Sequence, residues 1–235
     1  MHKRSVKYRH IFFDLDHTIY DFEKSSRHTL LDLYRRHELP DRGISDPEAF
    51  HEVYKRINIG LWEKYKRGEM EKEFLNVERF HLSLNEFRVN DRELAESIAM
   101  DYIRESPLKP FLFPQVREAL EYLKAKYALH IITNGFEEVQ ESKLKANDLG
   151  KYFRSVTTSE EAGVKKPFPE IFMFALKKAG AKPEESLMIG DDIEVDIKGA
   201  KAAGMDQVFF NYTGIEHDET VTYEVRSMEE IMDIL

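Results

Sequence analysis

The chain has 235 residues and a mass of 27.7 kDa, with 35 lysines and arginines against 44 aspartates and glutamates, which gives a formal net charge of −9. A net-negative surface repels phosphate backbones, and the sequence has no concentrated basic patch, so we do not expect a nucleic-acid partner. The chain contains no cysteine, which excludes disulfides, thiolate metal sites and a cysteine nucleophile. Any metal must therefore bind to oxygen or imidazole ligands.

We expect no secretory signal in the amino-terminal segment. It carries Lys3, Arg4, Lys7 and Arg9, but the apolar run that follows, Ile11–Phe13, is too short for a secretory signal peptide. No stretch of the sequence approaches the ~18 apolar residues of a membrane span. We therefore expect a cytoplasmic protein that does not associate with membranes.

The first predicted element is a short buried strand over residues 11–13. Residues 24–106 follow it, and their apolar residues recur only at helical spacing. Four consecutive amphipathic helices are expected there, around residues 30–34, 50–61, 74–80 and 94–102. They predict an inserted helical domain over residues 20–109, with the alternative that these helices simply flank a sheet. Trp62 and Tyr65 lie in the second helix and have two interpretations, stacking on a base or packing inside the bundle.

After the insert, short apolar runs alternate with helical patterns. The runs at 129–132, 187–189 and 208–210 predict three more buried parallel strands. Helices are expected after Pro114 and over residues 137–147, 169–179 and 193–203, and Gly180 and Gly204 mark the ends of the last two. This alternation predicts an α/β fold with a doubly wound parallel sheet, formed by residues 1–19 and 110–235.

Polar residues follow the first two predicted strands, at the sheet edge where open α/β folds bind ligands. Asp14 and Asp16 come after the first strand, and two carboxylates this close repel each other. A Mg²⁺ ion or a raised pKa in one carboxyl would relieve the repulsion. Thr133, Asn134 and Gly135 follow the second strand, where a hydroxyl, an amide and the N–H groups of a tight turn would form an anion cradle.

The second half of the chain adds a cation and more carboxylates. Lys166 precedes Pro167, while Asp191 and Asp192 end a strand, with Asp196 one helical turn later. Taken one by one, these residues also fit a solvated lysine pair and helix-capping carboxylates. Their convergence at the strand ends favours Mg²⁺-assisted chemistry on a phosphate group. Motifs of serine hydrolases, dinucleotide-binding folds, P-loop enzymes and HExxH metalloproteases are absent from the sequence.

Four strings along the chain resemble, in order, the four motifs of the haloacid dehalogenase superfamily. They are DLDHT (14–18), TNG (133–135), KPFPEIF (166–172) and GDDIEVDI (190–197). The helical insert is similar to the superfamily's cap domain, placed after the first strand of a Rossmann-like core. Two longer strings, DLDHTIYDF (14–22) and TNGFEEVQESKL (133–144), are similar to a bacterial subgroup of pyrimidine 5′-nucleotidases. The resemblance implies a monomeric or weakly dimeric Mg²⁺-dependent phosphatase whose substrate is a nucleoside monophosphate.

The resemblance also implies roles for individual residues. Asp14 would be the nucleophile that forms an aspartyl-phosphate, and Asp16 would protonate the leaving oxygen and then activate water. Thr133 and Lys166 would stabilise the transferring phosphoryl group. The implied metal ligands are Asp14, the Asp16 backbone carbonyl and Asp191, with Asp196 and Asp192 behind them. The implied substrate contacts are Asn134, Gly135, Tyr20 and Phe22.

Three other activities fit parts of the same pattern. A phosphatase for phosphoglycolate or a sugar phosphate would use the same core residues, because these residues handle only the phosphoryl group. A 2-haloacid dehalogenase expels halide and requires neither Asp16 nor Asp191, so the presence of both disfavours it. A phospho-accepting signalling receiver also gathers Asp, Thr and Lys around Mg²⁺, but its phosphoacceptor lies on a later strand and it needs no helical insert.

Overall fold

The computed structural model describes residues 8–235, and the chain forms two compact units. The first unit contains the chain up to Phe22 together with Pro110–Leu235, and the second contains Glu23–Lys109. Tyr20 and Phe22, which the sequence interpretation placed in the helical insert, belong to the first unit. The role of the second unit as a cap stays a prediction. The amino-terminal charges at positions 3, 4 and 7 lie outside the described residues.

The first unit is built on a six-stranded parallel sheet, which confirms the predicted α/β fold class. The strands lie in the order β3 (Phe153–Thr158), β2 (Ala128–Thr133), β1 (His10–Phe13), β4 (Ser186–Gly190), β5 (Asp206–Phe210) and β6 (Tyr223–Val225). Every neighbouring pair is parallel. The strand order reverses between β1 and β4, and open sheets bind ligands at the carboxyl ends of the strands beside such a switch point.

The strands β1, β2, β4 and β5 lie at the four apolar runs that predicted them. Sequence interpretation missed β3 and β6. The β3 strand is at one edge of the sheet and only its last two residues, Thr157 and Thr158, are buried. The β6 strand has three residues at the other edge. Edge strands need no continuous apolar run, because they are not covered on both faces.

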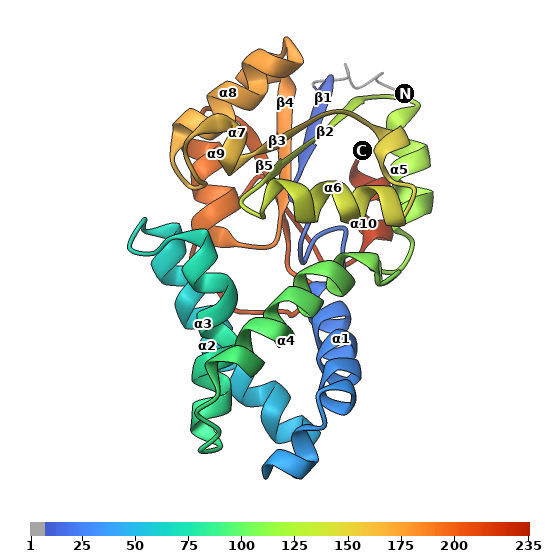
Figure 1. Ribbon diagram of the computed structural model, residues 1–235. Coiled ribbons are helices and arrows are strands. Elements are labelled where there is room, and N and C mark those ends of the chain that lie inside the picture. The colour runs from blue at the N-terminus through green and yellow to red at the C-terminus, as the bar shows by residue number, and fades with distance from the viewer. Residues whose placement is uncertain (1–7) are drawn as a thin grey trace. The chain divides into compact units, whose positions relative to one another are not determined.

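Helices cover both faces of the sheet (Figure 1). One face carries α5 (Val116–Lys124), α6 (Glu137–Ala146) and α10 (Met228–Ile234), and the other carries α7 (Ser159–Ala162), α8 (Pro169–Ala179) and α9 (Lys198–Ala202). Within β1, Ile11 and Phe13 pack on the first face and Phe12 packs on the second. This alternation is the period-2 geometry of a strand, and burial on both faces explains why β1 is continuously apolar.

The helix predicted over residues 193–203 is divided in two. A π-helical turn, Ile193–Ile197, precedes α9. Its first backbone N–H groups are capped by Asp192, whose Oδ1 accepts hydrogen bonds from the backbone N–H groups of Glu194 and Val195, both at 3.0 Å. The end near Gly204 agrees with the sequence interpretation, because Gly204 adopts a positive φ of 80° immediately after the helix.

The second unit consists of four helices inserted between β1 and β2, as predicted. They are α1 (Phe22–Arg36), of which the first residue belongs to the first unit, α2 (Pro47–Lys66), α3 (Lys72–Glu86) and α4 (Arg92–Glu105). The carboxylates of Asp46 and Asp91 cap the backbone N–H groups that begin α2 and α4. Trp62 and Tyr65 pack edge to face with ring centroids 5.4 Å apart, and their contact with a base stays a prediction. Within residues 8–235, every helix falls short of the length and hydropathy that a membrane span requires.

Candidate active site

A buried lysine connects three segments at the carboxyl edge of the sheet. Lys166 Nζ donates to Asp14 Oδ1 after β1 and to Asp196 Oδ1 after β4, both at 2.6 Å. It also donates to the Ile132 carbonyl of β2 at 3.0 Å. Only 2% of Lys166 is exposed. These three acceptors account for the three hydrogens of the ammonium group, so the lysine is held in one position. The resemblance implied Lys166 and not its neighbour Lys165, and Lys166 is the lysine that contacts Asp14.

The carboxylates around Lys166 are electrostatically crowded. Burial raises the pKa of Asp14 to about 7, although Lys166 opposes the shift. Burial also raises the pKa of Asp191, and the nearby carboxylates Asp196 and Asp14 raise it further. For Lys166, burial alone would lower the pKa, but Asp14 and Asp196 outweigh it and hold the pKa above its usual value. One ammonium group therefore faces more negative charge than it neutralises.

The carboxylate cluster has the chemistry of a divalent-cation site. One oxygen from each of Asp14, Asp191 and Asp196 lies within 4.8 Å of the other two. Mg²⁺ takes oxygen ligands at about 2.0–2.1 Å, so ligands on opposite sides of the ion lie about 4 Å apart. The spacing and the uncompensated negative charge both fit Mg²⁺. Both oxygens of Asp196 also accept hydrogen bonds, Oδ1 from Lys166 Nζ and Oδ2 from the Asp192 backbone N–H.

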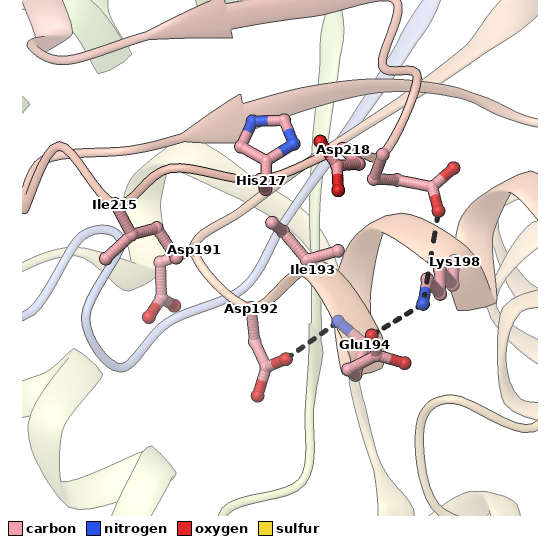
Figure 2. Close-up of a pocket in the computed structure, with 9 residues that line it drawn as sticks. Asp191, Asp192, Ile193, Glu194, Lys198, Ile215, His217 and Asp218 are labelled. Atoms are coloured by element: carbon pink, nitrogen blue, oxygen red, sulfur yellow. Dashed lines mark hydrogen bonds and ion pairs between the residues drawn. The ribbon is translucent and has the colours of Figure 1, made fainter.

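The adjacent residues Asp191 and Asp192 have different environments. Asp191 Oδ1 accepts a hydrogen bond from Thr18 Oγ1 at 3.3 Å and belongs to the carboxylate cluster. Asp192 caps the following helical turn, and Figure 2 shows its carboxylate bonded to the backbone of Glu194. Both residues line a pocket of about 640 Å³ that also contains Lys198 and His217. The carboxylate that faces the cluster is therefore Asp191.

The side chain of Asp16 is bound by two side chains of α6 and is not one of the three carboxylates that converge. Its Oδ1 accepts a hydrogen bond from Lys143 Nζ at 2.5 Å, and its Oδ2 accepts one from Gln140 Nε2 at 2.9 Å. Burial alone would raise the pKa of Asp16, but Lys143 and Gln140 outweigh it and hold the pKa below its usual value. The contact of the Asp16 backbone carbonyl with a metal stays a prediction.

The turn after β2 is organised by hydrogen bonds. Thr133 Oγ1 accepts one from Gln140 Nε2 at 2.8 Å and one from the Gly135 backbone N–H at 3.1 Å. Asn134 bonds to the backbone of Lys166 at both ends of its amide, donating to the carbonyl at 3.0 Å and accepting from the N–H at 2.8 Å. Asn134 thus fixes the segment that carries the lysine. A direct substrate contact by Asn134 or Gly135 stays a prediction.

Tyr20 and Phe22, the two aromatic residues expected to contact substrate, lie next to Lys143. Tyr20 is fully buried, and Phe22 is half-buried against the core of the first unit. The Lys143 ammonium lies 5.0 Å from the Tyr20 ring centroid and 5.6 Å from the Phe22 ring centroid. The rings therefore contact the cation that binds Asp16. Their contact with a substrate stays a prediction.

Sequence interpretation assigned no role to Gln140 and Lys143. A signal was present, because the buried positions of α6 include 140, 143 and 144, which lie on one helical face, and two of these three are polar. Long polar side chains on a core-facing stripe require partners. The partners were not identifiable, since Asp16 is 124 and 127 residues distant in the chain.

Comparison with known proteins gives a consistent family assignment. A family model described as haloacid dehalogenase-like hydrolase matches residues 8–204. The protein YfnB of Bacillus subtilis, named as a HAD-hydrolase, is 30% identical over 97% of this chain and 96% of its own length. Its crystal structure with bound magnesium has a TM-score of 0.86 and 29% identity, and covers 97% of this chain and 98% of that one.

Two further relatives carry named activities on different phosphate esters. The pyrimidine 5′-nucleotidase PynA of Streptococcus pneumoniae is 28% identical over 97% of this chain and 95% of its own length. A glyceraldehyde 3-phosphate phosphatase of Pyrococcus furiosus is 32% identical over 96% of this chain and 92% of its own length. The chain is thus similar along nearly its whole length to phosphatases with different substrates.

Proposed function

Because the chain belongs to the haloacid dehalogenase-like hydrolase family, we propose that it hydrolyses phosphomonoesters through an aspartyl-phosphate, with pyrimidine nucleoside monophosphates as substrates. The observation that carries the proposal is the convergence of Asp14, Lys166 and Asp191 from three distant segments. A nucleophile, a fixed cation and a further carboxylate beside one another suit attack on a phosphoryl group.

In the first step, a carboxylate oxygen of Asp14 forms a bond to phosphorus while the bond from phosphorus to the ester oxygen breaks. The leaving oxygen takes a proton from Asp16, so the nucleoside departs as a neutral alcohol. Lys166 offsets the charge that develops on the phosphoryl oxygens. The Thr133 hydroxyl donates a hydrogen bond to a phosphoryl oxygen. The product of this step is an acyl phosphate on Asp14.

In the second step, water forms a bond to the same phosphorus and the bond to Asp14 breaks. Asp16, now ionised, accepts the proton from the attacking water. The carboxylate of Asp14 is restored and inorganic phosphate is released. Lys143 lowers the pKa of Asp16, which favours transfer of its proton to the leaving oxygen in the first step and keeps the carboxylate ionised before the second.

The Mg²⁺ site would consist of the carboxylates of Asp14 and Asp191 with the backbone carbonyl of Asp16. Bound Mg²⁺ would neutralise charge on the phosphoryl oxygens and orient the ester toward Asp14. The close spacing of Asp14 and Asp191 supports this ligand set. Asp196, which is shared with Lys166 and the backbone of residue 192, would hold the lysine in place.

Two carboxylates, Asp16 and Asp191, favour phosphate chemistry over dehalogenation, because expulsion of halide requires neither of them. Asp16, which is bound by Gln140 and Lys143, would serve as the acid–base group, and Asp191 lies close to the proposed nucleophile Asp14. A second substrate class, triose or sugar phosphates, is supported by the similarity to glyceraldehyde 3-phosphate phosphatase. The strings 14–22 and 133–144 favour nucleotides.

A substrate panel tests the proposal. UMP, dTMP, glyceraldehyde 3-phosphate and phosphoglycolate are incubated with the protein, with and without Mg²⁺, and released phosphate is measured. We expect multiple turnovers that require Mg²⁺ and the highest kcat/KM with UMP or dTMP. Rejection of every nucleotide with turnover of glyceraldehyde 3-phosphate would replace the substrate class and retain the phosphatase. Absence of turnover with every ester would contradict the phosphatase itself.

A further inference from the structure

We propose that Gln140 and Lys143 are positioning residues, which set the orientation of Asp16 and of the Thr133 hydroxyl for phosphoryl transfer. The inference rests on the proposed function and extends it to two residues on α6 outside the four motifs. Gln140 is fully buried and Lys143 is 3% exposed. Burying two long polar side chains is unfavourable unless each is paired, and both pair with the same carboxylate.

The Asp16 carboxylate is anchored at two points. Lys143 binds Oδ1 and Gln140 binds Oδ2, so each oxygen has its own donor. Two donors on different atoms fix the rotation of the carboxylate, whereas a single donor would leave it free to turn. The Lys143 ammonium is itself held between Asp16 and the rings of Tyr20 and Phe22. The carboxylate that handles the leaving oxygen is thus fixed before substrate binds.

Gln140 also sets the direction of the Thr133 hydroxyl. A hydroxyl has two acceptor lone pairs and one hydrogen. Gln140 Nε2 and the Gly135 N–H fill the two acceptor positions of Thr133 Oγ1. The hydrogen of the Thr133 hydroxyl is then left to donate, and a phosphoryl oxygen of the substrate is a suitable acceptor. The amide nitrogen of Gln140 therefore binds both Asp16, which handles the leaving oxygen, and Thr133, which contacts the phosphoryl oxygens.

The orientation of the Gln140 amide follows from its neighbour. Gln140 Nε2 donates both to Asp16 Oδ2 and to Thr133 Oγ1, so the amide nitrogen and not the amide oxygen faces Asp16. The turn after β2 makes room for this nitrogen, because a Cβ atom added to Gly135 would lie 1.9 Å from Gln140 Nε2. The position of the Gln140 side chain therefore requires glycine at position 135.

The test compares two phosphate esters that differ in their need for a proton on the leaving oxygen. p-Nitrophenyl phosphate releases a stable phenolate, whereas UMP and glyceraldehyde 3-phosphate must release an alcohol. The ratio of kcat/KM for the better of these two alkyl esters to kcat/KM for p-nitrophenyl phosphate reports proton donation in the first step. A general loss of folded protein lowers both values and leaves this ratio unchanged.

We expect Lys143→Met to lower this ratio by about tenfold or more, because a positioned acid contributes about 10²–10⁴-fold to such steps. Lys143→Arg retains the cation and should recover part of the ratio. Gln140→Leu should lower kcat/KM for both esters, since Thr133 contacts the phosphoryl group of each, and should lower it further for the alkyl ester. Lys145→Met changes an exposed lysine of the same helix and should leave both values unchanged.

Three results would contradict the inference. A ratio that stays at the wild-type value in both Lys143→Met and Gln140→Leu would show that these residues serve packing alone. Full activity of both variants on both esters would exclude any role. If the wild-type protein turns over neither alkyl esters nor p-nitrophenyl phosphate, the proposed function fails and the positioning role fails with it. That third result differs from the first two because it appears without any substitution.

Discussion

Lys166 Nζ lies 2.6 Å from Asp14 Oδ1, although the two residues are 152 positions apart in the chain. The contact exists because β1 and β3 lie on either side of β2 in one parallel sheet, so the segments that follow β1 and β3 reach the same edge. The Asn134 amide holds the Lys166 backbone at that edge, and Asp196 holds the ammonium group from the other side. The proposed nucleophile and its cation are therefore oriented by the fold itself.

Replacing Lys166 with Met should abolish most of the turnover while the protein remains folded. Removal of one fixed charge stabiliser typically lowers kcat by about 10²–10³-fold. Lys166→Arg should not restore activity, because the planar guanidinium cannot reproduce three donors in a site that is 2% exposed. Phosphate release and circular dichroism check both variants. A kcat within about threefold of wild type, well short of that range, would contradict the role given to Lys166.

Gly190→Ala should impair catalysis, although Gly190 has no side chain that could take part in the reaction. An added Cβ would lie 2.4 Å from Asp196 Oδ2, so Asp196 or β4 must move. We expect a loss of about 1–3 kcal/mol in the free energy of unfolding, typical of overpacking, together with a lower kcat. Gly150→Ala is the matched control, because an added Cβ there meets no atom within 4 Å. Urea denaturation and phosphate release measure the two effects. Equal behaviour of both alanine variants would contradict this prediction.

Mg²⁺ should stabilise the protein in the absence of substrate. A ligand at a hundredfold excess over its Kd stabilises the folded state by about 2.7 kcal/mol, which thermal unfolding detects as a higher Tm. Asp191→Asn should abolish the shift, because it removes a ligand from the cluster. The same variant should unfold at a higher temperature than wild type without metal, since it removes one of several like charges. An undiminished Mg²⁺ shift in Asp191→Asn would exclude Asp191 as a ligand.

His130 should make the protein less stable in acid. Burial, together with the nearby His10 and Arg154, lowers the pKa of His130 to about 4. The unfolded chain has a histidine pKa near 6.5 and so binds more protons between about pH 6.5 and pH 4, which means that stability falls as pH falls through this range. We expect His130→Gln to show a shallower decline in the free energy of unfolding over this window. Parallel curves for variant and wild type would contradict the prediction.

The sequence was sufficient to predict the central strands and the strand-end residues. Ile11, Phe12 and Phe13 are apolar because both faces of β1 are covered, and the first charged residue after them marks the sheet edge. Asp14 and Thr133 were predicted because they follow apolar runs, whereas Lys166 was predicted from the lysine–proline motif and the family resemblance. Contacts among segments that each follow a central strand are thus partly determined by topology.

The remaining features depend on tertiary contacts that the sequence does not specify. Asp191 and Asp192 are equivalent as neighbours in the chain, and only the start of the helical turn assigns the capping role to Asp192. Gln140 and Lys143 lie in a helix that was predicted, but their inward direction depends on a carboxylate over 120 residues away. The β3 strand was missed because its burial is incomplete at the sheet edge.

The most direct test of the account is to locate the phosphoryl group during turnover. Asp16→Asn removes the group that activates water, so the covalent intermediate should accumulate when this variant is mixed with Mg²⁺ and p-nitrophenyl phosphate, whose leaving group needs no proton. After acid quenching, mass spectrometry of the digested protein should find one phosphoryl group on the peptide that contains position 14. The group should be absent when Asp14→Asn is added to the same variant. A phosphoryl group on another residue, or full turnover by Asp14→Asn alone, would contradict the central claim.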